Sequence, residues 1–138
     1  MTIQARPSPC PSCPYRRDVP PGVWAASEYD KLPAYDLDIA DGQPIGAFHC
    51  HSTPDQLCSG WLACHGPRNL LGVRMLLAFG RADPKVLDAW TDVPVFGSGR
   101  EAAEHGKSGI DNPPEEATAA QEKIVRARKR RGEPLRWE

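Results

Sequence analysis

Five cysteines carry most of the chemistry that this sequence could perform. Cys10 and Cys13 form a C-x-x-C pair, and two intervening residues are the spacing at which one tight turn directs two thiolates toward a single metal ion. Cys50, Cys58 and Cys64 follow at less regular intervals. These residue types predict a metal site in which the C-x-x-C pair supplies two of the ligands.

The other ligands can come from several combinations. Our first prediction is a tetrahedral set of four thiolates, from Cys10, Cys13, Cys50 and Cys58. Three neighbouring side chains are alternates, namely His51, Cys64 and His65. His51 could replace Cys50, Cys64 could replace Cys58, and His65 could be a spare ligand or support one. We expect Trp61 to be buried, either in the apolar shell of the metal or in the core.

The proline-rich arm that carries Cys10 and Cys13 indicates which kind of metal site to expect. Residues 1–23 hold six prolines, and a proline-rich segment cannot form a backbone hydrogen-bond ladder. A structural zinc ion would anchor this arm with a free energy on the order of 10 kcal/mol. A [4Fe-4S] cluster uses the same four thiolates and is the alternative cofactor.

Catalytic interpretations lack the context that they require. A thiol oxidoreductase places its C-x-x-C at a helix N-terminus after a strand, whereas prolines flank Cys10 and Cys13 here. Cys64 and His65 are adjacent, so their side chains are poorly placed to act as nucleophile and base. Gly106-Lys107-Ser108 lacks the earlier glycine of a nucleotide-binding P-loop, since position 101 is glutamate. We therefore expect a non-enzymatic protein, with a thiol-dependent enzyme as the third hypothesis.

Length and composition indicate one small domain without a membrane partner. The chain has 138 residues with 15 prolines and 12 glycines, which favours short elements joined by irregular chain. The most apolar run, 70–79, is interrupted by Arg74 and is too short to span a bilayer. Arg16-Arg17 precedes Asp18 and prolines instead of the apolar core of an export signal. With an odd number of cysteines and no such signal, we expect a soluble cytoplasmic protein whose thiols bind metal.

The charges are divided unevenly along the chain. Residues 1–125 carry 11 Lys and Arg against 16 Asp and Glu, whereas residues 126–138 carry 6 against 2. The basic run consists of Arg126, Arg128, Lys129, Arg130 and Arg131. It could contact the phosphates of nucleic acid, and so could Arg16 and Arg17 beside the Tyr15 ring. The alternatives are a solvated chain end and an ion pair of Arg17 with Asp18 or other nearby acids.

Local patterns predict the elements that would position these residues. A short helix is expected from Ser27 to Leu32. Asp41-Gly42 predicts a β-ribbon between 37–40 and 45–48 that delivers Cys50. Apolar spacing predicts the main core helix over 69–79, and Asp83-Pro84 starts another helix with Val86, Leu87 and Trp90 inward. Ser98 and Glu101 form a capping box for a third helix that ends before Gly106, and a terminal helix starts near Pro114.

Together these elements predict a small, irregular α+β fold. A metal-pinned N-terminal arm and a β-ribbon would pack on short helices, followed by a basic C-terminal helix. The predicted division is a cysteine-rich metal-binding domain over 1–106 and a polar linker with the basic helix over 107–138.

Three segments also carry a family resemblance. They are Cys10-Pro-Ser-Cys-Pro-Tyr-Arg-Arg-Asp-Val-Pro20, Phe48-His-Cys-His51, and Cys58-Ser-Gly-Trp61 with Cys64-His65. From about Pro9 to Gly106 the chain resembles an uncharacterised family of small cysteine-rich proteins of bacteria and bacteriophages. The resemblance implies that the three segments form one site, and it favours Cys50 and Cys58 over His51 and Cys64. It brings no established activity with it.

The predicted function follows from the metal site and the basic tail. We expect a binding or regulatory protein whose metal site organises a surface for nucleic acid or for a protein of the transcription or replication machinery. The second hypothesis is an iron-sulfur redox or sensor protein.

Overall fold

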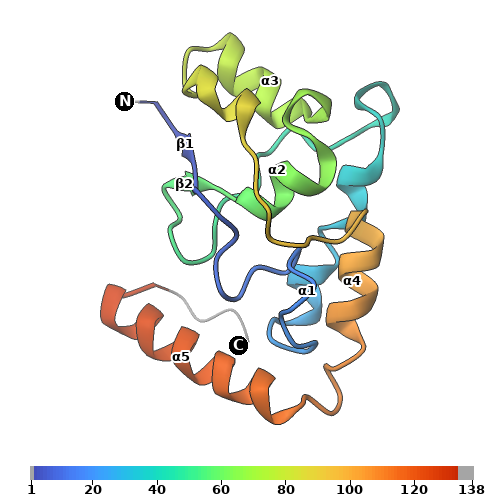
Figure 1. Ribbon diagram of the computed structural model, residues 1–138, viewed down its shortest axis with the longest axis vertical. Coiled ribbons are helices and arrows are strands. Elements are labelled where there is room, and N and C mark those ends of the chain that lie inside the picture. Colours follow the sequence, from blue (N-terminus) through green and yellow to red (C-terminus); the bar gives the residue numbers. More distant parts are fainter. Residues whose placement is uncertain (1, 134–138) are drawn as a thin grey trace.

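The computed structural model describes residues 2–133 and confirms a small, irregular mixed fold in them (Figure 1). The α-helices are α1 (Ala26–Tyr29), α2 (Ser59–His65), α3 (Leu71–Ala78), α4 (Gly99–Lys107) and α5 (Glu115–Arg131). The strands are β1 (Gln4–Ala5) and β2 (Gln56–Leu57). Short 3-10 helices span Pro33–Asp36, Ile39–Asp41, Pro67–Asn69 and Pro84–Asp88.

The N-terminal arm has little regular structure but contributes much of the core. Its only strand, β1, pairs in parallel with β2, with Gln4 opposite Gln56. The chain then passes α2 and reaches α1 (Figure 1). Helix α5 lies at the end of the molecule opposite α3. Buried side chains of the arm include Tyr15, Val19, Val23 and Trp24. Side-chain burial therefore holds the arm where backbone pairing cannot.

The predicted β-ribbon over 37–48 is wrong, because the described residues contain no strand there. Gly42 does adopt the left-handed backbone that the sequence indicated, with φ of 95°, but it ends the 3-10 helix Ile39–Asp41 instead of a hairpin. The side chain of Gln43 explains the difference, since it bonds to the carbonyls of Leu37 and Asn69 and to the amide of Leu71. This segment is shaped by its contacts with the start of α3.

The helices near residues 59–88 match the prediction in part. Helix α3 lies within the predicted core helix, whereas α2 was not predicted. Asp83 accepts a hydrogen bond from the amide of Lys85 as expected of an N-cap, but the helix that follows is one short 3-10 segment. Val86 is buried in agreement with the prediction, whereas Trp90 is 77% exposed and the prediction of an inward Trp90 is wrong.

Helix α4 begins at the predicted cap and packs closely on α1. The hydroxyl of Ser98 accepts a hydrogen bond from the amide of Glu101 at 3.1 Å. Gly106 belongs to the helix instead of ending it. Its lack of a side chain allows close packing on α1, because a Cβ at this position would collide with the ring of Tyr29. The predicted short helix at residue 27 is also present, as α1, but Ala25 is its N-cap and provides no side-chain bond.

The predicted C-terminal helix is present as α5 and packs against the arm. Ala117 is buried on its inner face, and the side-chain amide of Gln121 donates a hydrogen bond to the carbonyl of Gly22 at 2.6 Å. None of the helices in residues 2–133 combines the length and apolar character needed to cross a membrane.

Candidate metal centre

The C-x-x-C pair occupies a tight turn of the arm. The amide of Cys13 donates a hydrogen bond to the carbonyl of Cys10 at 3.0 Å. Both side chains are buried, with Cys10 3% and Cys13 0% exposed. The turn therefore presents two thiols to the interior, as the spacing indicated.

Cys50 and Cys58 lie on opposite arms of a short loop. The amide of Cys50 donates to the carbonyl of Gln56, and the amide of Cys58 donates to the carbonyl of Phe48, both at 2.9 Å. Both cysteines are buried. This loop, which lies later in the chain than the predicted ribbon, delivers Cys50 and Cys58 together.

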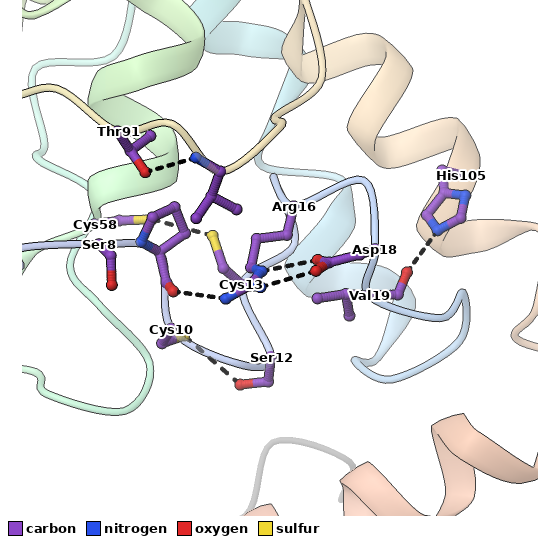
Figure 2. Close-up of polar contacts among 12 residues, drawn as sticks. Ser8, Cys10, Ser12, Cys13, Arg16, Asp18, Val19, Cys58, Thr91 and His105 are labelled. Carbon is purple, nitrogen blue, oxygen red and sulfur yellow. Dashed lines mark hydrogen bonds and ion pairs between the residues drawn. The ribbon is translucent and has the colours of Figure 1, made fainter.

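The four sulfurs interact as two pairs. The Sγ atoms of Cys13 and Cys58 lie 3.7 Å apart (Figure 2). Cys10 and Cys50 act on each other's pKa, and Sγ of Cys10 also lies 3.7 Å from the hydroxyl of Ser12 (Figure 2). Negative charge on Cys13 raises the pKa of both Cys10 and Cys58, and negative charge on Cys10 raises the pKa of Cys58. The fold thus places the four cysteines of the first predicted set in one buried region, which we call the thiol cluster, with Cys13 and Cys58 in contact.

Within each pair, the pKa values of the two cysteines are shifted in opposite directions. The hydrogen bond between Cys10 and Cys50 raises the pKa of Cys10 and lowers the pKa of Cys50 to about 5. The hydrogen bond from Cys58 lowers the pKa of Cys13, while burial and then the same bond raise the pKa of Cys58. One member of each pair is therefore the more acidic thiol.

Backbone amides also point at three of the sulfurs. The amide of Thr53 donates to Sγ of Cys50 and the amide of Trp61 donates to Sγ of Cys58, both at 3.4 Å. The amides of Tyr15 and Arg16 donate to Sγ of Cys13. Each donor lies two or three residues after the cysteine that it serves, so the turn or helix start that follows the cysteine supplies the bond. Amide donors stabilise the charged form of a sulfur. The local backbone therefore favours thiolates at these positions.

The predicted metal pinning of the arm is not supported by the arrangement of ligands. Within residues 2–133, no group of three or more His, Cys, Asp or Glu side chains is arranged to hold a metal ion. The arm is instead joined to the loop by the contact between Cys13 and Cys58 and by the pairing of β1 with β2.

The alternate ligands have other contacts. The ring of His51 lies 3.2 Å from a carboxylate oxygen of Glu28 and packs on Trp24. His65 contacts the hydroxyl of Tyr15 at 3.2 Å. Burial and nearby acidic groups raise the pKa of Cys64 to about 12.

Trp61 is fully buried, as predicted. Its backbone amide donates to Cys58, and its ring packs edge-on against Tyr35 with centroids 5.5 Å apart. The backbone of Trp61 thus contacts the thiol cluster, and its side chain lies in the apolar core.

A cavity of about 450 Å³ is lined in part by Cys50. Its wall includes Phe48, His51 and the buried carboxylate of Glu28. Sequence reasoning missed Glu28 because its contact with His51 joins distant parts of the chain. It also missed Gly60, although a glycine directly inside the Cys58-Ser-Gly-Trp61 segment was a readable signal of close packing.

The predicted contacts for nucleic acid lie in different surroundings. Arg16 forms a two-pronged ion pair with Asp18 at 2.8 Å (Figure 2). Arg17 lies 3.7 Å from Glu101 and its guanidinium stacks over Phe96, which matches the expected pairing with a nearby acid.

The basic run of α5 is divided between two faces. Arg128 is 3% exposed and its guanidinium lies 5.5 Å from the ring centroid of Trp24, so this residue belongs to the core. Arg131 pairs with Glu133 at 2.8 Å. Arg126, Lys129 and Arg130 are exposed.

Comparison with known proteins identifies a family but no function. Searches among curated proteins and among solved structures gave no match. The model of a family of unknown function, DUF6283, matches residues 5–128. The match includes all four residues of the thiol cluster and most of α5, and it extends past the boundary predicted at residue 106. The chain belongs to this family of unknown function, DUF6283.

Proposed function

We propose that this protein is a non-enzymatic binding protein whose arm is fastened by one structural zinc ion, held by Cys10, Cys13, Cys50 and Cys58. The observation that carries the proposal is the burial of four cysteines from two distant segments in one region, with Cys13 and Cys58 in contact. Four aliphatic side chains would pack this part of the core better than four thiols do. Four thiols do match the ligand set of a structural zinc site.

The distance between two of the sulfurs agrees with binding to a single ion. Zinc–sulfur bonds of about 2.3 Å in a tetrahedron place neighbouring sulfurs about 3.8 Å apart, close to the 3.7 Å between Cys13 and Cys58. In a [4Fe-4S] cluster each cysteine binds a different iron, so the sulfurs stand farther apart. Zinc is therefore our first proposal for the cofactor and the cluster is the alternative.

Ionisation supports the same proposal. The pKa of Cys13 is lowered and that of Cys50 is lowered to about 5, and three of the sulfurs accept backbone amide donors. Zinc would replace the protons that the thiols still carry. Because metal binding by thiols releases protons, we expect the zinc affinity to rise with pH.

Metal analysis tests the proposal. Protein purified without oxygen should contain one zinc per chain, and Cys→Ser changes at positions 10, 13, 50 and 58 should each abolish or sharply weaken zinc binding. Cys64→Ser is the matched control and should keep the zinc. Iron with inorganic sulfide in place of zinc would support the iron-sulfur alternative, and the absence of any bound metal would contradict both.

For the partner we propose nucleic acid, contacted by the outer face of α5. Lys123, Arg126, Lys129 and Arg130 are exposed there, and no ion pair joins them to another residue in the part of the chain that the structure describes. Helical spacing puts Arg126 and Arg130 on the side opposite Ala117 and Gln121, which pack on the arm. An outward row of cations gives affinity for phosphates that does not depend on base sequence.

Salt dependence tests this contact. The triple variant Arg126→Gln, Lys129→Gln, Arg130→Gln should bind duplex DNA or RNA more weakly, and the slope of log K against log salt should fall by about three units. Arg68→Gln with Arg81→Gln removes exposed charges far from α5 and is the matched control. Unchanged binding by the triple variant, or no binding by the natural protein, would contradict the proposed partner.

A further inference from the structure

We propose that the outer face of α3 is a docking surface for an acidic amphipathic helix of another protein. This surface, the α3 face, consists of the apolar side chains of Leu71, Met75, Phe79 and Ile45 and of the arginines around them. It lies at the end of the molecule opposite α5 (Figure 1). The proposal therefore depends neither on the zinc ion nor on the contact with nucleic acid.

Apolar side chains occupy successive turns on the solvent side of α3. The amide of Phe79 donates a hydrogen bond to the carbonyl of Met75 at 3.1 Å, so helical spacing continues from Leu71 through Met75 to Phe79. Residues four apart lie on one face of a helix. Leu71 and Met75 are half-buried and Phe79 is 70% exposed, whereas Val73 on the opposite face is fully buried. Such a row differs from the single exposed apolar residues that any protein surface carries.

Ile45 widens the row at the start of α3. The absence of a side chain on Gly72 lets the backbone of Ile45 approach, since a Cβ there would lie 3.0 Å from the carbonyl oxygen of Ile45. The side chain of Ile45 is 62% exposed. From Leu71 to Phe79 the row is about 12 Å long, because each residue of a helix rises about 1.5 Å. Roughly two turns of a partner helix would cover this length.

The charges around the row identify the kind of helix that fits. No Asp or Glu occurs between Asp55 and Asp83, whereas Arg68, Arg74 and Arg81 do. All three arginines are exposed, and Nε of Arg74 donates to the carbonyl of Arg68 at 2.8 Å. Within residues 2–133 no ion pair joins any of them to an acid. Asp or Glu residues beside the apolar row of a partner would supply the missing countercharge.

Two acids from another segment lie near Arg74 without neutralising the α3 face. Asp36 and Asp38 line a cavity of about 490 Å³ together with Arg74. The carboxylate of Asp36 already accepts the amides of Gly99 and Arg100 at the start of α4. Asp38 alone does not balance three arginines, so the α3 face remains positive.

Charge also argues against other occupants of the α3 face. In a two-fold dimer through this surface the same patch comes from both copies, so the arginines of one copy would face those of the other. Like charges that meet across an interface disfavour it strongly. The phosphates of nucleic acid would pair with the arginines but would leave the apolar row in water. An acidic amphipathic helix satisfies both features.

Selection from a displayed library of random helical peptides tests the inference. The target is the full-length protein, and peptides of about 14 residues are long enough to form helix. We expect the bound peptides to carry apolar residues at i, i+3 or i+4 and i+7, with Asp or Glu beside them. Their affinity should fall about tenfold or more for Phe79→Ser, because an aromatic anchor is lost. Phe79→Leu should recover part of this affinity.

A charge variant tests the arginines separately. The triple variant Arg68→Gln, Arg74→Gln, Arg81→Gln should associate with the selected peptides about tenfold more slowly at low salt. The matched control is the triple variant of α5 at positions 126, 129 and 130, which removes the same charge at the other end of the molecule and should bind the peptides normally. Urea unfolding verifies that each variant is folded.

Several results would overturn the inference. One is a failure to enrich any peptide relative to the Phe79→Ser protein, and another is a set of selected peptides that are basic. Dimerisation in sedimentation that Phe79→Ser abolishes would assign the α3 face to a second copy. Binding to phosphatidylserine vesicles that the same substitution abolishes would assign it to a membrane surface.

Discussion

A Cβ atom on Gly60 would lie 2.6 Å from Sγ of Cys13 and 2.8 Å from Cβ of Tyr15. Gly60 is in the first turn of α2, two residues after Cys58. The missing side chain therefore lets the start of this helix press against the arm, and that close approach brings the sulfurs of Cys13 and Cys58 into contact.

Gly60→Ala should destabilise the protein even though alanine favours helix. The helix gains about 1 kcal/mol from the substitution, but the Cβ displaces buried atoms in a packed core, at a cost of about 1–3 kcal/mol or more. We expect a lower free energy of unfolding in urea and weaker zinc binding. Gly46→Ala is the control, since a Cβ there meets no atom within 4 Å. Equal stability and zinc content in both variants would show that α2 does not press on the arm.

Asp36 caps α4 from a distant part of the chain. Its two carboxylate oxygens accept the amides of Gly99 at 2.6 Å and Arg100 at 2.9 Å. Loss of such a cap and of its negative charge at a helix N-terminus costs about 1–2 kcal/mol. Asp36→Ala should lower the unfolding free energy by this amount in urea titration, and the exposed Asp38→Ala should change it little. A loss of equal size in both would mean that charge near this segment, and not the cap, is responsible.

The pH dependence of stability should contain a contribution from His65. Burial lowers the pKa of His65, although Asp36 partly opposes the shift. The unfolded state therefore takes up a proton first as the pH falls below about 6.5, so this contribution to stability is present above that pH and is lost below it. His65→Gln should weaken the dependence. The measurement is the unfolding free energy of both zinc-loaded proteins at pH 7.5 and 5.5, and an equal decrease in both would contradict the assignment.

Prediction from sequence succeeded where the cause of a structure is local. The cap at Ser98, the apolar spacing of α3 and the charge gradient of α5 each act within a few residues, and the corresponding helices are present. The C-x-x-C turn is local in the same way. Burial of Trp61 was also foreseen, from its place beside Cys58.

Prediction failed where distant residues decide the outcome. The Asp41-Gly42 turn lies in a segment held by bonds from Gln43 to the start of α3, which no dipeptide signal reveals. The pairing of Cys13 with Cys58 links residues 45 positions apart. The spacing of cysteines can suggest a common site, but it cannot say which sulfurs touch.

Arg128 shows the same limit within the basic run, and it leads to a further prediction. The run of cations looks uniform in sequence, yet Arg128 is buried over Trp24 while Arg126 is exposed. Arg128→Ala removes a buried cation–π contact and leaves a cavity, so it should lower the unfolding free energy by about 2–3 kcal/mol. Arg126→Ala should change stability by less than about 0.5 kcal/mol.

The two arginines should also separate stability from binding. If the outer face of α5 contacts nucleic acid, Arg126→Ala should weaken binding and reduce the salt slope by about one unit. Arg128→Lys keeps a cation over Trp24 and should retain binding while recovering part of the stability lost in Arg128→Ala. Urea unfolding and salt-dependent binding of all three variants check this separation. If instead Arg128→Lys loses binding at full stability, Arg128 reaches the partner directly and its buried position in the free protein is not the one that binds.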